Sequence, residues 1–471
     1  MIAALKKLTF LFIALFAALV LRAQTCDCYE NLTALIKETE TNYAGFPSKT
    51  AVNKAGYTNL KQTLLVKSKA VARYKTCFDI LAAYVQFFKD KHFYITYYDV
   101  TDIDSVVVHP KSNTYFQQAS LKKGFEGTWV NPDKNLTIGI EKKGNNYIGY
   151  KLEGTADAYP AGFVYFTLFA KNGKWYALDY NNRTSTSTPV KLYGNLLQFW
   201  DFNCWARADS TLLTKKEKKD FAQWKGFDKP VYFEQLNAQT GYFKIGTFSN
   251  TDAKIAQVAA ENDAAIRKSE KLIIDLRGNS GGSTGWVSIL PYIQTSDIYQ
   301  PLASLRITKS NLAKKLPEIE PFAKGPVPDE YKKYFPESIL RQYQIAFDTL
   351  QKMQSGFYQI PGAFFPNDQP ANTIKKVILL VDEFCGSSTE YFLQLSKQSK
   401  KTIIAGTNTF GMMDYEGMSN GTDLPYSKFS VHIPITKSNW TDTAPIDAGG
   451  IQPKNRVPAG TVDWIKWAMQ L

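Results

Sequence analysis

Residues 272–282 read Leu-Ile-Ile-Asp-Leu-Arg-Gly-Asn-Ser-Gly-Gly, and this stretch decides the fold of the second half of the chain. Its first three residues form an apolar run of the kind found in strands that are buried on both faces. The glycines that follow let backbone amides approach a ligand closely, which suits an oxyanion or phosphate cradle. A tight turn after the strand explains the same glycines. The spacing does not fit the G-x-G-x-x-G fingerprint of dinucleotide-binding proteins.

A second stretch, residues 377–390, reads Val-Ile-Leu-Leu-Val-Asp-Glu-Phe-Cys-Gly-Ser-Ser-Thr-Glu and predicts a buried strand, a turn and a helix. Ser387 would then lie at the N-terminus of the helix, where unpaired amides and the helix dipole stabilise developing negative charge. The alternative is an ordinary capping box between Ser387 and Glu390. We assign Cys385 to packing, because free cysteines commonly fill buried positions.

The pattern around these stretches predicts a layered α/β domain over residues 226–471. Short apolar runs at residues 242–245 and 402–404 indicate strands, and residues 252–269 and 389–398 indicate helices. Because buried strands alternate with helices, a layered α/β core follows.

The first half of the chain has a different texture. Residues 24–120 form an N-terminal segment that is mostly helical in pattern, since apolar residues recur every three or four positions between residues 29 and 90. Residues 121–225 contain short alternating strands separated by turns such as Asn172-Gly173, which predicts a small antiparallel β domain.

Residues 1–23 have the layout of a secretory signal peptide. Lys6 and Lys7 precede an apolar run over residues 8–20, and we place cleavage after Ala23. A membrane anchor is the alternative, but this run is shorter than the ~20 residues that span a bilayer. We expect an exported protein, periplasmic or secreted, with no integral membrane span after signal removal.

Charge and cysteine content restrict the possible partners and cofactors. The formal net charge of the 471-residue chain is +13. Basic residues at 215–219 are interspersed with Glu217 and Asp220, which is typical of a solvated surface, so we expect no nucleic-acid partner. The five cysteines (26, 28, 77, 204 and 385) leave at least one thiol free. Cys77 could pair with either of the first two, and we expect no metal site or cofactor.

The two motifs together resemble C-terminal processing peptidases, tail-specific proteases and tricorn protease. In that family a D-x-R-x-N-x-G-G turn precedes a strand that ends in S-x-x-E. The resemblance covers residues 226–460 and implies a crotonase-like α/β core. It also implies that Ser387 is the nucleophile, and that the amides of Ser388 and Gly281 form the oxyanion hole.

One element departs from the processing peptidases. Those enzymes carry a general-base lysine in a T-F-G-K-G element, where this chain has Met412. A thioether cannot accept a proton at neutral pH, so either the chain is inactive or the base comes from elsewhere. The tricorn-like branch uses a histidine from the N-terminal part. His92 lies in a matching D-x-H element, whereas His109 and His432 lie in strand-like segments.

A histidine base needs an acceptor that orients its ring. The resemblance to the tricorn-like branch implies Asp447, which precedes a G-[VI]-x-P element at residues 450–453. Here an aspartate replaces the family's glutamate and reaches one methylene less far. A turn cap before Gly449 explains Asp447 equally well. The branch also has a serine before the histidine, where this chain has Lys91.

We therefore expect a serine-type endopeptidase that hydrolyses peptide or protein substrates through an acyl-enzyme on Ser387, with His92 as general base. No segment indicates a PDZ domain, so we expect the β domain to gate or recruit substrate. The alternative is a non-catalytic protein that keeps the fold, has lost the base, and binds peptides or small apolar ligands. A structural cell-envelope protein is a third hypothesis. The oligomeric state stays open.

Overall fold

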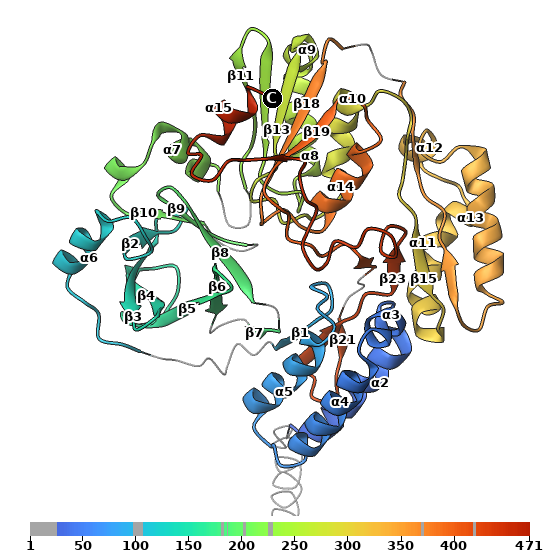
Figure 1. The fold of residues 1–471 in the computed structure, drawn as a ribbon, viewed down its shortest axis with the longest axis horizontal. Coiled ribbons are helices and arrows are strands. Elements are labelled where there is room, and N and C mark those ends of the chain that lie inside the picture. Colours follow the sequence, from blue (N-terminus) through green and yellow to red (C-terminus); the bar gives the residue numbers. More distant parts are fainter. Residues whose placement is uncertain are drawn as a thin grey trace, which may run out of the picture.

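The computed structural model describes residues 26–97, 107–179, 183–185, 187–200, 204–224, 229–368, 372–417 and 421–471. The predicted signal peptide lies outside these residues. Within them, no helix combines the length and the apolar character needed to cross a membrane. The fold is mixed α/β and contains several separate sheets (Figure 1).

A six-stranded sheet forms the centre of the C-terminal half. Its strand order is β11 (Val231–Asn237), β12 (Thr240–Ile245), β13 (Lys271–Asp275), β18 (Lys376–Val381), β19 (Thr402–Gly406) and β24 (Asn455–Arg456). All neighbours are parallel except the β11–β12 hairpin. Because β13 and β18 pair directly, with Asp275 opposite Leu380, the two motif turns leave the sheet side by side.

Helices cover both faces of this sheet. One face packs against α8 (Asp252–Glu261), α9 (Asp263–Lys268), η2 (Gly285–Ile289), α10 (Leu290–Ile293) and α14 (Ser388–Ser396). The other face packs against α15 (Trp464–Ala468). The predicted strands and the layered α/β arrangement of this region are confirmed, because the apolar runs lie in a sheet that is buried on both sides.

A further layer lies beside the sheet (Figure 1). Its helices are α11 (Lys309–Lys324), α12 (Asp329–Lys332) and α13 (Glu337–Leu350). They accompany two small sheets, which consist of β14 (Ile298–Tyr299) with β17 (Phe364–Phe365), and of β16 (Phe357–Gln359), β15 (Ala303–Arg306), β23 (Thr436–Ser438) and β20 (Tyr415–Glu416).

The antiparallel region expected before residue 225 is a closed eight-stranded barrel. Its strands, in order around the barrel, are β10 (Cys204–Arg207), β2 (Gly127–Val130), β3 (Leu136–Lys143), β4 (Asn146–Gly154), β5 (Val164–Lys171), β6 (Lys174–Asp179), β8 (Thr188–Tyr193) and β9 (Leu196–Phe199). The pairing of β10 with β2 closes it. Sequence patterning did not predict this closure, because the two strands are far apart in the chain. The flanking helices are α6 (Asn113–Ser120), η1 (Ser210–Leu212) and α7 (Lys215–Ala222).

The described part of the N-terminal segment begins with helices, as its apolar pattern predicts, and a strand follows them. Its helices are α2 (Cys28–Asn42), α3 (Phe46–Ala51), α4 (Lys54–Ser68) and α5 (Tyr74–Gln86). Strand β1 (Tyr94–Tyr97) then pairs with β22 (Phe429–His432) of the C-terminal half and with β7 (Arg183–Thr184), while β21 (Thr422–Asp423) completes the sheet. This sheet therefore joins three distant parts of the chain.

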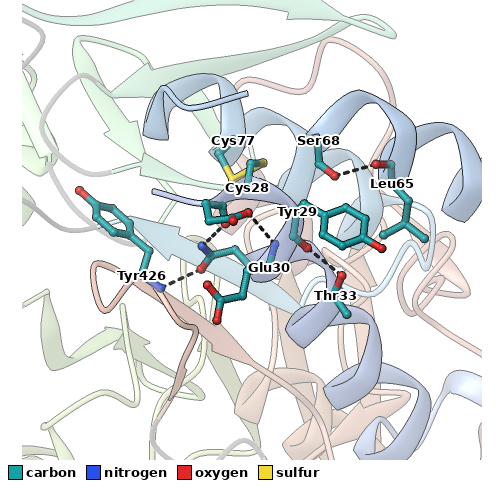
Figure 2. Close-up of a disulfide and its surroundings, with 10 residues drawn as sticks. Cys28, Tyr29, Glu30, Thr33, Leu65, Ser68, Cys77 and Tyr426 are labelled. Carbon is teal, nitrogen blue, oxygen red and sulfur yellow. Dashed lines mark hydrogen bonds between the residues drawn. A yellow bond between two sulfur atoms is a disulfide. The ribbon is translucent and has the colours of Figure 1, made fainter. Parts of the chain in front are cut away.

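A disulfide joins α2 to α5 (Figure 2). It links Cys28 to Cys77, which settles the choice that the sequence left open. The remaining cysteines, Cys26, Cys204 and Cys385, are free and buried.

The purified, unreduced protein should expose three thiols in guanidinium chloride and five after reduction, as measured with a thiol-reactive chromophore. Because a cross-link restricts the unfolded chain, Cys77→Ala should lower the free energy of unfolding by about 2–5 kcal/mol. Cys204→Ala is the control and should not change the disulfide. A single free thiol in the unreduced protein would contradict this pairing pattern.

Candidate active site

The turn before α14 holds Ser387 in an unusual backbone conformation. Its φ is 51° and its ψ is −125°, a region that residues other than glycine rarely occupy. The Ser387 side chain makes no capping hydrogen bond to the helix. The capping-box interpretation is therefore wrong, and the hydroxyl is available to a neighbouring side chain.

That neighbour is His92. Its Nε2 lies 3.1 Å from Ser387 Oγ, although 295 residues separate the two in sequence. Its Nδ1 lies 2.8 Å from the carbonyl oxygen of Tyr415. A carbonyl oxygen only accepts hydrogen bonds, so Nδ1 carries the proton and the lone pair of Nε2 faces the serine hydroxyl. Burial lowers the pKa of His92, because the charged imidazolium is poorly solvated there.

Asp90 fixes the turn that presents His92. Its Oδ1 accepts a hydrogen bond from the backbone amide of His92 at 2.9 Å, and its Oδ2 accepts one from the hydroxyl of Tyr43 at 2.7 Å. The adjoining β1–β22 pairing sets the direction of the chain after the histidine. Sequence reasoning did not select Asp90 as a site residue, although the D-x-H element contains it.

Asp447 was expected to orient the His92 ring, but its carboxylate binds other groups. Its Oδ1 accepts from the amide of Asp414 at 3.0 Å, and its Oδ2 accepts from Lys49 Nζ at 3.1 Å. The Tyr415 carbonyl occupies the orienting position instead. Burial, and the nearby carboxylate of Asp90, raise the pKa of Asp447 well above its usual value. A backbone acceptor has no sequence signature, so Tyr415 could not be found from the sequence.

Lys91 is directed toward the loop at residues 409–413. Its ammonium donates to the carbonyl oxygens of Phe410 at 2.8 Å and Asp447 at 3.1 Å, and also to that of Gly411. Burial lowers its pKa. This lysine replaces the serine of the tricorn-like pattern, and it ties together two loops that border the site.

Glu390 holds the same loop from the other side. Its buried carboxylate accepts from the Thr409 hydroxyl at 2.5 Å, from the Gly411 amide at 2.7 Å and from the Met412 amide at 2.9 Å. Burial raises its pKa to about 7. Glu390 is therefore not the second member of a capping box with Ser387, because its carboxylate binds the loop.

The glycine turn packs directly against the serine turn. A side chain at Gly281, whose φ is +107°, would meet Ser387 Cβ at 2.8 Å and Ser388 N at 2.8 Å, so only glycine fits. The Gly281 amide donates to Asn279 Oδ1 at 3.0 Å. Ser388 is the first residue of α14, and its amide is one of the donors that a helix leaves without an internal partner.

A cavity of about 630 Å³ opens at the serine and histidine. Met412, at the position of the family's lysine, lines it together with Ser387, His92 and Lys91. The lining also includes residues of the barrel, such as Phe166.

Neither of the other two histidines belongs to the lining of this cavity. His109 is exposed, and the ring of His432 stacks on Tyr94 with centroids 4.4 Å apart. The buried Cys385 thiol donates to the carbonyl of Leu276, and Arg277 forms an ion pair with Asp275 at 2.6 Å. In the described part of the chain, no three His, Cys, Asp or Glu side chains are grouped as a metal would require.

A hydroxyl and a correctly oriented imidazole, at the mouth of a cavity on an α/β core, form an arrangement that is typical of serine hydrolases. Residues 239–457 match the sequence model of peptidase family S41. The resemblance expected from the two motifs is thus confirmed, and the match supports a serine peptidase. A comparison with curated proteins gives no match.

Solved structures share the fold. Mature CPAF matches with a TM-score of 0.54 and 13% identity over 92% of both chains. Mature CPAF complexed with lactacystin matches with a TM-score of 0.52 and 13% identity over 92% of this chain and 94% of the other. A peptidase-like protein from Parabacteroides merdae ATCC 43184 has a TM-score of 0.45 and 15% identity over 94% of this chain and 93% of the other.

Glu390→Gln should destabilise the protein by about 1–3 kcal/mol, because the amide group turns a donor toward one of the loop amides. The pKa of Glu390 is raised to about 7 in the folded protein. As the pH rises, the carboxyl group of Glu390 therefore loses its proton at a lower pH in the unfolded state than in the folded state. The stability advantage of the native protein over the variant should therefore shrink between about pH 4.5 and 7. Urea denaturation at several pH values measures this difference.

The exposed Glu261→Gln is the matched control and should change the free energy of unfolding by no more than about 0.5 kcal/mol. A constant difference between the native protein and Glu390→Gln from pH 4.5 to 7 would contradict the raised pKa.

Proposed function

We propose that the chain is a serine-type endopeptidase in which Ser387 is the nucleophile and His92 is the general base. The single observation that carries this proposal is the 3.1 Å contact between Ser387 Oγ and His92 Nε2, with Nδ1 held by a carbonyl. The peptidase family of residues 239–457 supports a peptide or protein substrate.

The reaction would follow the general scheme of covalent acyl transfer. Ser387 Oγ attacks the peptide carbonyl carbon while Nε2 of His92 accepts the hydroxyl proton. The imidazolium returns this proton to the leaving amine, the C–N bond breaks, and an acyl-serine remains. Water, deprotonated by the same nitrogen, then hydrolyses the ester and regenerates the serine.

Two neighbours support His92 rather than a lysine as the base. Met412 has no basic group, and the Lys91 ammonium already donates to three carbonyl oxygens. A lysine can act as a base only after losing a proton, which would remove at least one of these hydrogen bonds. A neutral imidazole needs no such rearrangement.

The oxyanion hole is proposed at the meeting point of the two turns. The Ser388 amide lies at the N-terminus of α14, where the helix dipole favours negative charge. Gly281 is the proposed second donor, and its amide would be shared with Asn279 Oδ1 when substrate binds. Asp447 is proposed to position His92 indirectly. Its carboxylate accepts a hydrogen bond from the Asp414 amide, and this bond helps to fix the loop that carries the Tyr415 carbonyl.

We further propose that residues 1–23 are a signal peptide, that the mature protein is periplasmic or secreted, and that the α/β core has crotonase-like layering. Lys6, Lys7 and the apolar run at residues 8–20 support the signal peptide and the export. The family resemblance supports the layering, and CPAF supports the overall fold.

A fluorophosphonate probe should label the protein at Ser387, as located by peptide mass spectrometry. Ser387→Ala should abolish labelling, and His92→Ala should slow it by about 10³-fold or more, because the hydroxyl loses its base. His432→Ala is the matched control and should label normally, since this histidine lies outside the described cavity lining. If the native protein stays unlabelled, the hydrolase hypothesis is wrong, and a non-catalytic binding protein is the remaining alternative.

The labelling rate should rise with pH along a limb whose midpoint lies below the ordinary histidine pKa of about 6.5. Burial disfavours the charged form, so the reactive neutral imidazole already predominates at lower pH. Second-order labelling rates from pH 4.5 to 8 measure the midpoint. A midpoint above 7, or an unchanged limb in His92→Ala, would contradict His92 as the base.

A further inference from the structure

The cavity at Ser387 is shared between two parts of the fold. At one end its walls are Ser387, His92, Ser280 and the glycine turn of the α/β core. At the other end its walls come from strands of the eight-stranded barrel and consist of Leu136, Phe166, Ala177, Phe199 and Trp205. The space near the serine is thus continuous with the barrel.

The barrel residues that line the cavity also belong to the interior of the barrel. All five are members of its buried hydrophobic cluster. The rings of Phe166 and Phe199 contact each other with centroids 4.8 Å apart. Deeper in the same cluster, Trp129, Ile138 and Leu168 are fully buried. The barrel is therefore filled with side chains in its centre, and only its mouth faces the cavity.

The mouth of the barrel is held against the serine turn by specific contacts. Trp200, which follows β9, donates through Nε1 to the carbonyl of Phe384 at 3.0 Å and packs on Phe410 with centroids 4.7 Å apart. From β8, Lys191 forms an ion pair with Glu383 at 2.8 Å, and the hydroxyl of Tyr193 donates to the buried carboxylate of Asp382. These contacts fix the barrel relative to the residues that immediately precede Ser387.

The two ends of the cavity differ in chemistry. Hydroxyl, imidazole and ammonium groups lie at the serine end, together with the side chains of Phe410 and Met412. At the barrel end the lining is mainly aromatic and aliphatic, and its polar members are Asn131, Asp179 and Thr188. An apolar wall with polar groups at one end is the usual form of a pocket that recognises an apolar group beside a reacting bond.

We propose that the barrel mouth is a specificity pocket that receives a bulky apolar side chain of the peptide substrate, aromatic or large aliphatic, close to the bond that is cleaved. This inference rests on the proposed peptidase function. Transfer of such a side chain from water should favour the substrate about 10- to 100-fold over one with alanine at that position.

The first test uses the native protein. Cleavage sites in reduced, denatured casein and in a random peptide library are mapped by mass spectrometry. We expect one position, at a fixed distance from the cleaved bond, to be enriched in Phe, Tyr, Trp, Leu and Met. Cleavage without such a position, or with a charged residue preferred there, would overturn the inference.

The second test fills the pocket. Thr188 lines the cavity and pairs directly with Ala177 across β6 and β8, so both side chains lie on the same face. Thr188→Phe should reduce kcat/KM for a peptide with the preferred apolar residue about tenfold or more. Its reaction with the small probe diisopropyl fluorophosphate should stay within about threefold of the native rate.

Leu178→Phe is the matched control, because Leu178 neighbours Ala177 on the outer face and is 48% exposed. It should leave both measurements unchanged. If Ser387 is labelled but Thr188→Phe keeps the preference for apolar residues, the proposed pocket is wrong and the peptidase function stands.

If the native protein is not labelled, both the peptidase function and the pocket are wrong. Thermal denaturation shows whether each variant is folded, and the native cleavage map decides the proposal if Thr188→Phe is not.

Discussion

The site depends on one long-range constraint, the antiparallel pairing of β1 with β22. Ser387 lies in the turn between β18 of the central sheet and α14, and His92 lies in a segment 295 residues earlier. The β1–β22 register, in which Tyr94 lies opposite His432, sets the position of the chain two residues after His92. Asp90 then fixes the turn from the other side by accepting the His92 amide. Without this pairing the serine would lie at the end of a helix with no base beside it.

Two buried ionisable side chains hold the loops around this contact by hydrogen bonds. Glu390 binds two amides and a hydroxyl of one loop, and Lys91 binds the carbonyls of the same loop and of Asp447. Isolated buried charges are costly, so each is compensated by polar backbone groups of opposite sign. The loop that carries a catalytic lysine in processing peptidases is here a fixed scaffold, held by a carboxylate and an ammonium. Met412 can therefore face the cavity without any chemical role of its own.

The sequence patterns predicted features that depend on neighbouring residues in the chain. The apolar runs gave the strands β13 and β18, and the parallel pairing of two such strands explains why the glycine and serine turns meet. The motif resemblance also selected Ser387 and His92, which the structure brings into contact. Sequence reasoning missed the Tyr415 carbonyl, because any residue supplies one, and it assigned the orienting position to Asp447. It also missed the closure of the barrel, which depends on β10 reaching β2 rather than on any pattern within a strand.

The barrel adds a wall to the cavity of the α/β core. In the core, the two turns that meet at the serine carry little side-chain bulk, because their backbones must approach each other closely there. Gly281 has no room for a side chain, and Gly386 lies against Met412 and Trp200. The core adds Phe410 and Met412 to the cavity lining, and the barrel is the second unit that supplies large apolar side chains, among them Phe166, Phe199 and Trp205. The contacts of Lys191, Tyr193 and Trp200 hold that unit on the residues that lead into Ser387, so the shape of the pocket and the position of the nucleophile are fixed together.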